Sequence, residues 1–380
     1  MQVLTQFERK PFLFTDPKFI ISCTDPALFK SSFEDIEAAL SQGYYLAGFL
    51  SYEAGYYFEE KLYQDKQYDF PLIYLGAYKH FRKDKFAQLA SGQPGYRLEN
   101  LRLNITQKQY SFNINAIRDY IAKGDVYQIT YCLKLLFEFH GQPLSLYYQL
   151  LSQQPVPYPA YIQTDDFSIL SLSPELFIKK NSTHLVTKPM KGTWPRGNSL
   201  FSDLIAPLRL KYDRKNRAEN VMIADLLRND LGRLGVNIKA PTLFEVARYK
   251  TLCQMTSTVT AKVKQNISVH DLFSAIFPSG SVSGAPKIRA MGIINELEKD
   301  PRKIYTGAIG FITPDKDMFF NIPIRTILTN GKPGRQAGWP AEMGIGGGIV
   351  WDSTPLGEWD EGLLKAKFLT DLSGMPFCPA

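Results

Sequence analysis

Cysteine and histidine are both scarce in this chain of 380 residues. The cysteines lie far apart and form no Cys-x-x-Cys pair, which argues against a disulfide framework or a zinc site. The histidines stand singly, so the sequence offers neither a histidine-rich metal cage nor an evident Ser-His-Asp arrangement. These residues are Cys23, Cys132, Cys253, Cys378, His80, His140, His184 and His270. Any chemistry must therefore rest on carboxylates, lysines and backbone amides.

Long apolar runs and a bias toward charge of one sign are also missing. No stretch approaches the roughly 20 apolar residues of a membrane span, and the first residues lack the basic-then-apolar order of a signal peptide. We therefore expect a soluble, cytoplasmic protein with no membrane contact. The net charge of +7 is modest and basic residues are mixed with acidic ones, so we expect no nucleic acid partner. The charge by itself suits small anionic substrates or an acidic partner surface as easily as nucleic acid, and the alternative is an ordinary soluble surface.

What the sequence does contain is a mixture of strand-like and helical segments. Aromatic, apolar runs at 44–57 and 71–78 predict buried strands, and the stretch 161–187 predicts an antiparallel hairpin or meander. Further helices are predicted at 111–123, 213–234, 268–277, 285–297 and from 354 onward, and further strands at 126–139, 305–312, 318–328 and 343–350. Strands that pair mainly with neighbours and alternate with helices favour an α+β fold over a doubly wound parallel sheet.

Lys191 is the first candidate for chemistry. It lies between a proline and a glycine in the run TKPMKGT (187–193), just after a strand-like stretch. An amine attacks only when it is neutral, which requires a desolvated or cationic setting that lowers its pKa from ~10.4. Lys188 and Arg196 could contribute to such a setting. For this segment taken alone, the alternative is an ordinary solvated loop lysine.

Glu175 lies sixteen residues before Lys191, at the other end of the predicted hairpin. If the hairpin brings the two side chains together, they supply an acid and a nucleophile for an elimination or a substitution. The alternative is a turn glutamate that pairs with Lys179 or Lys180.

Three charged residues of the last predicted helix share one face. Glu358, Glu361 and Lys365 are spaced by three and then four positions, which places their side chains on one side of the helix. Magnesium prefers a few carboxylates together with water and substrate oxygens, which suits this face. Glu219, near the start of the helix predicted at 213–234, is a further carboxylate. The alternative for each residue is a solvated, ion-paired helix face.

Two glycine-rich segments can let the backbone approach an anion closely. The run GIGGGIV (344–350) passes through a predicted strand and so is not a dinucleotide fingerprint, and PSGSVSGAPK (278–287) lacks the ending of a P-loop. A structural turn is the alternative for each. Arg325 interrupts an otherwise apolar predicted strand, where it either pairs with an acid or grips a ligand carboxylate.

These segments belong to a longer series of motifs that spans roughly residues 115–368. The motifs are GDVYQ (124–128), SPELF, KPMKGTWPRG, RAENVMIADLLRNDLGRLG, PSGSVSGAPKIRAM, YTGAIGF, IPIRT and GIGGGIVWDSTPLGEWDE. In this order they resemble the chorismate-utilising enzymes: the large subunits of anthranilate synthase and aminodeoxychorismate synthase, isochorismate synthase and salicylate synthase.

The resemblance implies the fold of anthranilate synthase component I. We therefore expect one large α+β domain over residues 1–380, in which two mostly antiparallel sheets pack between helical layers. Within it we expect a sheet-rich N-terminal part at 1–105 and a chorismate-binding catalytic part at 106–370.

Two positions separate the branches of this family. The water-adding relatives carry a lysine in place of Gln128, and glutamine cannot serve as the base that activates water. Most relatives carry alanine in place of Lys191, whereas the aminodeoxychorismate synthases carry lysine in this Pro-x-Lys-Gly-Thr run. The N-terminal FLSYEAGY also resembles that branch. The resemblance therefore favours the branch of para-aminobenzoate and folate biosynthesis.

The resemblance further implies an amino-group transfer to chorismate. Lys191 would attack C2 of the ring while Glu175 protonates the departing C4 hydroxyl, and ammonia would then add at C4 and expel the lysine, giving 4-amino-4-deoxychorismate. Mg²⁺ would be held by Glu219, Glu358 and Glu361. The residues expected to hold chorismate are Gln128, Thr193, Tyr305, Gly307, Arg325, Gly346, Gly347, Gly348 and Lys365.

Separate chains are expected to complete the pathway. Ammonia should come from a glutamine amidotransferase subunit, because this chain has no room for that domain, and a downstream aminodeoxychorismate lyase should also be a separate chain. Two departures from the family pattern remain: Cys253 and Gln254 lie where many relatives carry a histidine (249–257), and Ser281 replaces a threonine while keeping its hydroxyl. The alternatives are an anthranilate synthase component, which needs no lysine at position 191, and a catalytically idle subunit that binds chorismate or an amidotransferase.

Overall fold

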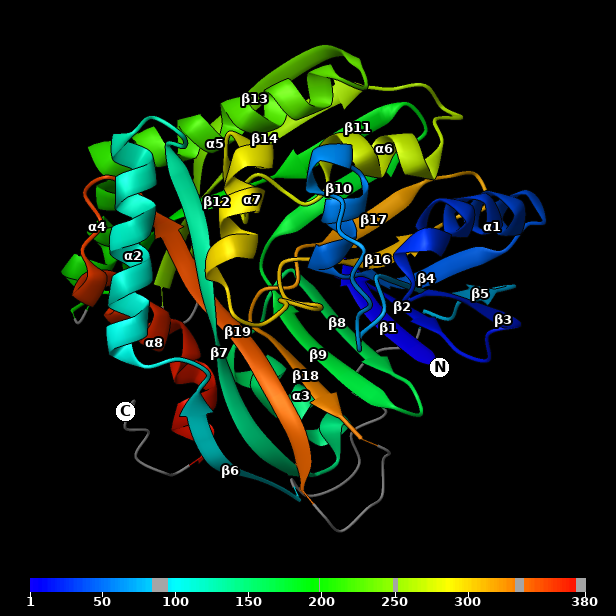
Figure 1. Ribbon diagram of the computed structural model, residues 1–380, viewed down its shortest axis with the longest axis horizontal. Helices are drawn as coiled ribbons and strands as arrows, with labels where there is room; N and C mark the ends of the chain where they lie inside the picture. Colours follow the sequence, from blue (N-terminus) through cyan, green and yellow to red (C-terminus); the bar gives the residue numbers. More distant parts are fainter. Residues whose placement is uncertain (84–94, 198, 249–251, 332–337, 374–380) are drawn as a thin grey trace.

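The computed structural model describes residues 1–83, 95–197, 199–248, 252–331 and 338–373 (Figure 1). Cys378 and the first part of the stretch 249–257, residues 249–251, lie outside the described residues. Within them the chain forms two large antiparallel sheets with helices on their outer faces, so the predicted α+β class is confirmed.

The first sheet, sheet A, contains nine strands in the described residues. Their order is β15-β7-β19-β18-β9-β8-β1-β2, and β6 also pairs with β7. The strands are β1 (Gln2–Phe7), β2 (Lys10–Phe14), β6 (Tyr96–Leu103), β7 (Gln128–Gly141), β8 (Tyr158–Gln163), β9 (Phe167–Ser173), β15 (Gly284–Ala285), β18 (Thr326–Asn330) and β19 (Trp339–Ile349). The long central strands β7 and β19 carry candidate residues at the end of the sheet where Gln128 and Gly348 lie close together.

The second sheet, sheet B, contains ten strands in the part of the chain described. Their order is β12-β14-β11-β10-β17-β16-β4-β5-β3, and β13 pairs with β14. The strands are β3 (Phe19–Cys23), β4 (Tyr45–Leu50), β5 (Ile73–Tyr78), β10 (Leu176–Asn181), β11 (His184–Lys188), β12 (Met190–Pro195), β13 (Val236–Arg248), β14 (Leu252–Lys262), β16 (Ala308–Ile312) and β17 (Met318–Asn321). Strand β12 contains Lys191.

Helices cover the outer faces of both sheets (Figure 1). They are α1 (Phe29–Ser41), α2 (Gln107–Ala122), α3 (Pro143–Gln153), α4 (Leu200–Tyr212), α5 (Arg214–Gly232), α6 (Val269–Ile276), α7 (Lys287–Leu297) and α8 (Pro355–Ser373), with short 3-10 turns at Pro26–Leu28, Tyr52–Tyr57 and Glu60–Leu62. Apolar side chains of α1, α5 and α6 pack on sheet B, and those of α2, α3, α7 and α8 pack on sheet A. The predicted arrangement of two sheets between helical layers is therefore confirmed.

Strands from the first 105 residues lie in both sheets. Strand β1 pairs with β8 in sheet A, and β4 pairs with β16 in sheet B. A shared apolar cluster joins the two sheets, and Val3 and Phe14 of sheet A pack there with Phe49 and Phe311 of sheet B. The N-terminal segment therefore packs in the same hydrophobic core as the later part of the chain.

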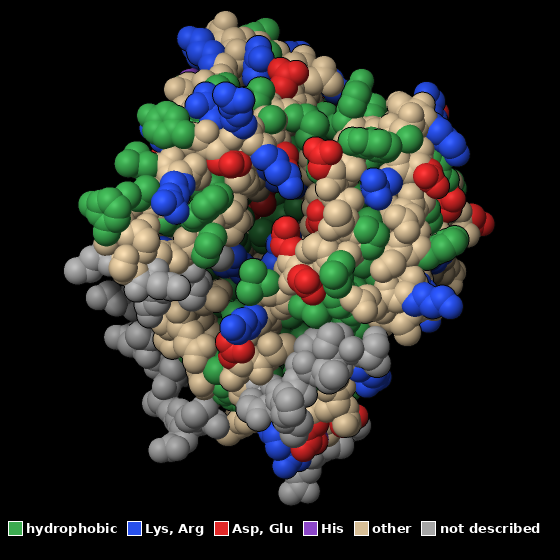
Figure 2. Space-filling model, turned by 90° about the vertical axis from the view of Figure 1, so that its left-hand side faces the viewer, with side chains coloured by type: hydrophobic (Ala, Val, Ile, Leu, Met, Phe, Trp, Pro, Cys, Tyr) green, Lys and Arg blue, Asp and Glu red, His purple; other side chains and the backbone are tan. Residues whose placement is uncertain are grey.

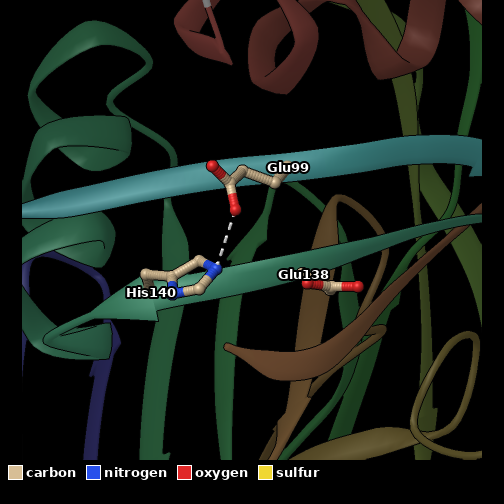
Figure 3. Close-up of side chains that lie close together, drawn as sticks. All are labelled: Glu99, Glu138 and His140. Carbon is tan, nitrogen blue, oxygen red and sulfur yellow. Dashed lines mark ion pairs between the residues drawn. The ribbon is translucent and has the colours of Figure 1, made fainter. Parts of the chain in front are cut away.

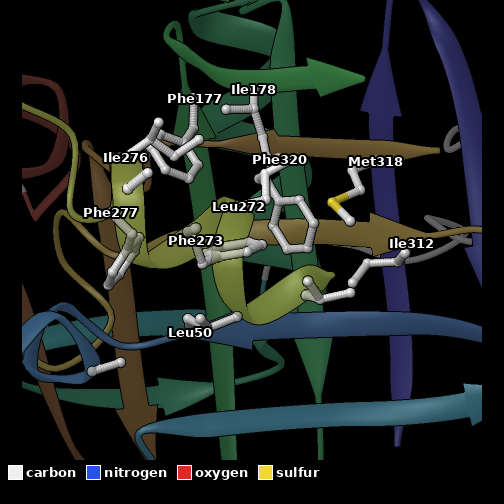
Figure 4. Packing of buried hydrophobic residues seen from close by; sticks show 14 of the residues in the cluster. Leu50, Phe177, Ile178, Leu272, Phe273, Ile276, Phe277, Ile312, Met318 and Phe320 are labelled. Atoms are coloured by element: carbon white, nitrogen blue, oxygen red, sulfur yellow. The ribbon is translucent and has the colours of Figure 1, made fainter. Parts of the chain in front are cut away.

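Helix α6 shows how tightly the outer helices pack on sheet B (Figure 4). Its residues Leu272, Phe273 and Ile276 are each at most 2 % exposed and point into the cluster between the helix and the sheet. The ring of Phe273 meets that of Phe320 edge to face, with 5.3 Å between the ring centroids. Full burial of an apolar side chain of this size contributes about 2–3 kcal/mol, so such contacts hold the helix in place.

Several predicted elements are confirmed with small shifts in their ends. The helices predicted at 213–234, 268–277 and 285–297 are α5, α6 and α7, and the strand predicted at 343–350 is the second half of β19. The last helix begins at Pro355, as predicted, and the backbone N–H of Gly357 donates to Thr354 Oγ1 at 3.3 Å. This cap followed by proline fixes the start of α8.

Two strand predictions were wrong in extent. The run 318–328 is not one strand, because the chain leaves sheet B at Asn321 and enters sheet A at Thr326. Pro323 has no N–H to offer a ladder, and Arg325 adopts φ +52°, a left-handed conformation that ends regular pairing. The run 44–57 likewise ends as a strand at Leu50 and continues as the 3-10 turn Tyr52–Tyr57.

The cysteines of the described residues, Cys23, Cys132 and Cys253, are buried and free. Burial raises the pKa of the Cys132 thiol to about 12, so this group stays protonated at neutral pH. Among the described helices, none has the length and apolar character needed to cross a bilayer.

Candidate active site

One face of the molecule is hollowed near its centre, and acidic and basic side chains gather around the hollow (Figure 2). Helices α2, α4 and α8 lie on this side of the molecule (Figure 1). The candidate residues that lie close to one another come from α5, α8, β7, β12 and β19, as the contacts below show.

Strand β19 has an open edge at its carboxyl end. Its pairing with β18 covers Ala341 to Met343, so residues 344–349 extend beyond that neighbour. The Lys365 ammonium donates to the carbonyl oxygen of Gly346 at 2.7 Å. Because the N–H and C=O of one strand residue point to the same side, and the sides alternate, the amides of Gly346 and Gly348 point to this open edge. The N–H groups of these amides can donate hydrogen bonds to an anion.

Gly348 lies close to two of the predicted site residues, Gln128 and Lys191. A β-carbon at this position would lie 2.3 Å from Nε2 of Gln128 and 3.3 Å from Nζ of Lys191. Only glycine leaves both side chains this close to the strand. Gln128 is 1 % exposed, and its Oε1 is a buried acceptor with no hydrogen-bond partner among the described residues. This oxygen is therefore available to a ligand that donates a hydrogen bond.

Gly347 likewise leaves room for the charged side chains of α8 to lie close to strand β19. A β-carbon there would lie 3.1 Å from Glu358 Oε2, 3.4 Å from Lys365 Nζ and 3.6 Å from Glu361 Oε1. Lys365 also pairs with Glu361 at 2.8 Å, and Ser353 Oγ donates to Glu358 Oε1 at 2.6 Å. The three charged residues thus share one face, as predicted, and that face lies over the glycine strand.

Lys191 lies within strand β12, at a bulge, and not in a solvated loop. Met190 pairs with Thr256 and Thr193 with Gln254, so three steps along β12 match two along β14. Such a bulge redirects the side chain at that point, and Gly192 allows it with φ +101°. The amide of Asn220 donates to the Lys191 carbonyl at 3.1 Å and holds the bulge against α5.

The electrostatic setting of Lys191 suits a nucleophile. Burial is the main cause that lowers the pKa of its ammonium, and Lys365 acts in the same direction. Glu175 and Glu219 oppose this effect by raising the pKa. Arg196, which the sequence suggests as a source of positive charge near Lys191, pairs instead with Asp203 through its guanidinium. Lys365 on α8 is the cation that acts on the lysine.

Glu175 is buried beside Lys191 and has its own donors. It is 2 % exposed, and its Oε1 accepts from Ser281 Oγ at 2.7 Å and from the Met190 backbone N–H at 3.3 Å. Burial raises the pKa of this carboxyl to about 7, against the lowering effects of Ser281 and Lys191. At neutral pH it is therefore both a proton donor and a proton acceptor.

The predicted hairpin is what brings Glu175 and Lys191 together. Strands β10 and β11 pair so that Leu176 faces Lys188, which returns the chain to Glu175. The alternative partners are engaged elsewhere, because Lys179 pairs with Glu8 and Lys180 donates to backbone carbonyls at 2.8 and 3.1 Å. Glu175 is therefore not an ordinary turn glutamate.

The predicted metal ligands are oxygen donors of the right kind for Mg²⁺. Glu358 and Glu361 both lie close to Gly347. Glu219 belongs to α5, and burial raises the pKa of its carboxyl. The negative charge of Glu361 also raises this pKa, which indicates that the two carboxylates are near each other. In the described residues the ligand atoms of these three side chains do not all come within 4.8 Å of one another. The residues fit the ion in the chemistry of their donor atoms.

A different trio of ligand-type residues does meet that distance: Glu99, Glu138 and His140 (Figure 3). His140 Nε2 lies 3.1 Å from Glu99 Oε2, and Asn100 donates to Glu138 Oε1 at 2.9 Å. This trio lies near the far end of β7, twelve residues from Gln128, which is up to ~40 Å along an extended strand. We interpret it as an ion-pair network of the β6–β7 ladder.

The structure places three of the remaining predicted substrate residues, Tyr305, Thr193 and Arg325, in different surroundings. Tyr305 is buried and its ring fills the space over Gly344, where a β-carbon would lie 2.2 Å from the ring. Thr193 is exposed on β12, directly opposite the buried Gln254. Arg325 lies at the corner between the two sheets and is partly buried.

Gly307 has a structural explanation. A β-carbon there would lie 2.3 Å from the Leu50 carbonyl oxygen, so this glycine allows β4 to pack closely. The sequence motifs do not reveal the roles of Asn220, which donates to the Lys191 carbonyl, and Ser353, which donates to Glu358. Each lies within a quoted motif: Asn220 follows Glu219, and Ser353 precedes the helix cap Thr354.

The sequence is similar to known proteins over most of its length. The chorismate binding enzyme family matches residues 9–371. Aminodeoxychorismate synthase component 1 of Bacillus subtilis is 36% identical over 263 residues, covering 69% of this chain and 54% of that protein. The Escherichia coli protein of that name is 37% identical over 261 residues (68% and 56%), and anthranilate synthase component 1 of Aquifex aeolicus is 33% identical over 290 residues (76% and 57%). The matched part thus spans little more than half of these relatives.

Solved structures share the fold. Anthranilate synthase component I from Streptococcus pneumoniae superposes with a TM-score of 0.78 at 24% identity, covering 97% of this chain and 92% of that one. The menaquinone-specific isochorismate synthase of Escherichia coli superposes with a TM-score of 0.75 at 16% identity, covering 98% and 88%. At these identities the likeness concerns the fold.

Proposed function

Because this chain belongs to the chorismate binding enzyme family, we propose that it is an aminodeoxychorismate synthase component 1, which converts chorismate and ammonia to 4-amino-4-deoxychorismate. The observation that carries the proposal is the pair of Lys191 and Glu175. Burial lowers the pKa of Lys191, which raises the fraction of its amine that is neutral, and a carboxyl with a pKa of about 7 is available as an acid. The relatives that carry this name support the same assignment.

In the proposed reaction the C2–N bond to Lys191 forms as the C4–O bond breaks. The ring double bonds shift between these carbons, and Glu175 gives its proton to the hydroxyl that leaves as water. Ammonia then forms the C4–N bond, the double bonds shift back, and the C2–N bond breaks to release Lys191 as an amine. Glu175 regains a proton from the ammonium product or from solvent, so every proton is accounted for.

The other residues would bind the dianion and select the nucleophile. The Lys365 ammonium and the amides of Gly346 and Gly348 offer positive charge and donors to the chorismate carboxylates. Gln128 has no basic group to activate water, and its free Oε1 can accept a hydrogen bond from ammonia. Bound Mg²⁺, held by Glu219, Glu358 and Glu361, would supply a Lewis-acidic charge for a substrate carboxylate.

We further propose that ammonia arrives from a glutamine amidotransferase partner, and that a separate lyase converts the product in para-aminobenzoate and folate biosynthesis. Three anthranilate synthase components are similarly related to this chain, at 33%, 36% and 35% identity. Lys191 separates the two functions, because the anthranilate reaction needs no amine nucleophile from the protein.

A product assay tests the proposal. The purified chain is incubated with chorismate, Mg²⁺ and an ammonium salt, and products are identified by chromatography and mass spectrometry. We expect aminodeoxychorismate from the wild type and at least ~100-fold less from Lys191→Ala, because covalent catalysis is lost. Lys262→Ala, which removes an exposed lysine of the same sheet, is the control and should match the wild type. Anthranilate or isochorismate as the sole product would refute the assignment.

A further inference from the structure

The carboxyl of Glu175 is held asymmetrically. Among the described residues, two hydrogen-bond donors reach this carboxyl, and both end on Oε1: the Ser281 hydroxyl at 2.7 Å and the Met190 backbone N–H at 3.3 Å. An N–H can only donate, so Oε1 must be the accepting oxygen whenever this contact is made. A carboxyl oxygen that carries the proton is the weaker acceptor. The proton of neutral Glu175 therefore belongs on Oε2.

The Ser281 hydroxyl is itself fixed in direction by a second serine. Ser279 Oγ lies 3.0 Å from Ser281 Oγ and accepts from the Ser281 backbone N–H at 3.4 Å. A hydroxyl has one proton, and Ser281 gives its proton to Glu175, so Ser279 must be the donor between the two hydroxyls. Both serines are at most 3 % exposed, which keeps water from competing for these bonds.

We propose that Ser281, backed by Ser279, is a positioning residue that keeps the proton of Glu175 on Oε2, the oxygen presented to the leaving hydroxyl of the substrate. This inference rests on the proposed function for the identity of the leaving group. It goes beyond it by assigning a role to the glycine-rich turn before α7, whose sequence resembles a phosphate loop. The turn orients the catalytic acid Glu175 through Ser281 and needs no phosphate ligand for this role.

Ser281 also sets the strength of the acid. Burial raises the pKa of Glu175, and the Ser281 hydrogen bond is the largest of the effects that lower it again. Lys191 of β12 is the charged side chain that acts on this carboxyl, and its effect has the same sign. In the part of the chain that the structure describes, the backbone of Glu175 is bonded to neutral groups: Ser173 Oγ of β9 accepts from its N–H, and the Ile322 N–H donates to its carbonyl. Without the hydroxyl, the pKa of Glu175 must rise further.

Three variants separate a positioning role from a structural one. Ser281→Ala removes the donor, and Ser281→Thr restores a hydroxyl. Ser283→Ala is the matched control, since it removes a buried hydroxyl of the same turn that donates to the Ser279 carbonyl at 2.9 Å instead of to Glu175. The rate of aminodeoxychorismate formation at saturating chorismate is measured against pH for each variant. Circular dichroism confirms that each one is folded.

We expect Ser281→Ala to lower kcat at neutral pH by at least ~10-fold, a modest part of what general acid catalysis contributes. The pH at which its kcat falls on the alkaline side of the pH–rate profile should move to a higher value. Ser281→Thr and Ser283→Ala should keep the alkaline side, or basic limb, of the wild-type profile. If Ser281→Ala keeps the wild-type limb, or if Ser283→Ala shifts it equally, the proposal is refuted.

A second readout is independent of which product the enzyme makes. The infrared difference between the wild type and Glu175→Gln isolates the carboxyl band of Glu175, whose pH midpoint is then followed in the Ser281 variants without substrate. A higher midpoint in Ser281→Ala supports the positioning role even if another product were found in the assay above. An unchanged midpoint contradicts it even if aminodeoxychorismate is confirmed.

Discussion

Replacing Glu175 by glutamine should make this protein more stable at alkaline pH while nearly abolishing its activity. Glutamine has the same shape, and its carbonyl oxygen can still accept from Ser281 and Met190. It removes a carboxyl that must ionise while it is 2 % exposed. The wild type therefore carries a cost of ionisation that the variant does not.

The size of this effect follows from the shift in pKa. Burial raises the pKa of Glu175 from 4.5 to about 7 in the folded state. The folded protein then binds more protons than the unfolded chain between these values, so stability falls as pH rises through this window and is level above it. Over the whole window of 2.5 units the cost is about 3 kcal/mol, at 1.36 kcal/mol per unit.

Urea unfolding at pH 5 and pH 8 measures this difference. At pH 5 most of the cost is still absent, so the two proteins should differ little. At pH 8 Glu175→Gln should be more stable by about 2–3 kcal/mol. Its kcat should fall ~100-fold or more at neutral pH, because the general acid is gone. If the variant gains no stability relative to the wild type between pH 5 and pH 8, then Glu175 does not ionise in this window and cannot be the tuned acid described here.

Three further substitutions test other parts of the site. Gly348→Ala should lower kcat/KM ~100-fold with little change in Tm, because its β-carbon would displace the Gln128 amide from 2.3 Å; wild-type kcat/KM would contradict this. Glu361→Gln should raise the Mg²⁺ concentration needed for half-maximal activity by at least ~10-fold, and an unchanged Mg²⁺ titration would remove this residue from the metal site. Lys365→Met should raise KM for chorismate ~10-fold through loss of the ammonium that caps the Gly346 carbonyl, as steady-state kinetics would show; an unchanged KM would place the substrate carboxylates elsewhere.

Much of the fold could be predicted because local pattern and final structure agree. Helix α5 has an apolar stripe and the Asp213 cap, which accepts from the Asn216 N–H at 2.8 Å, and both features are visible in the sequence. The hairpin that joins Glu175 to Lys191 could be predicted from alternating strands and polar turns. The run 318–328 could not, because its hydrophobic pattern continues while the backbone changes sheets at Arg325. Only tertiary packing decides that change.

The chemistry of the site was only partly accessible in the same way. The spacing of Glu358, Glu361 and Lys365 predicts a shared face, and the structure has it. The bulge at Lys191 arises from a mismatch between two strands, β12 and β14, that are far apart in the sequence, and no local signal encodes it. The lowered pKa of Lys191 likewise depends on burial and on Lys365 from the other end of the chain. Long-range packing supplies what the motif alone cannot.

The central claim is that Lys191 forms a covalent bond to the substrate, and trapping that bond tests it most directly. The protein is mixed with chorismate and Mg²⁺ in the absence of ammonia, quenched with acid on the millisecond scale, and analysed by peptide mass spectrometry. The account predicts a peptide containing Lys191 whose mass has increased by that of chorismate minus one water, and no such increase in Lys191→Ala. An adduct on another residue, or none on Lys191 in protein that turns over once ammonia is added, would contradict it.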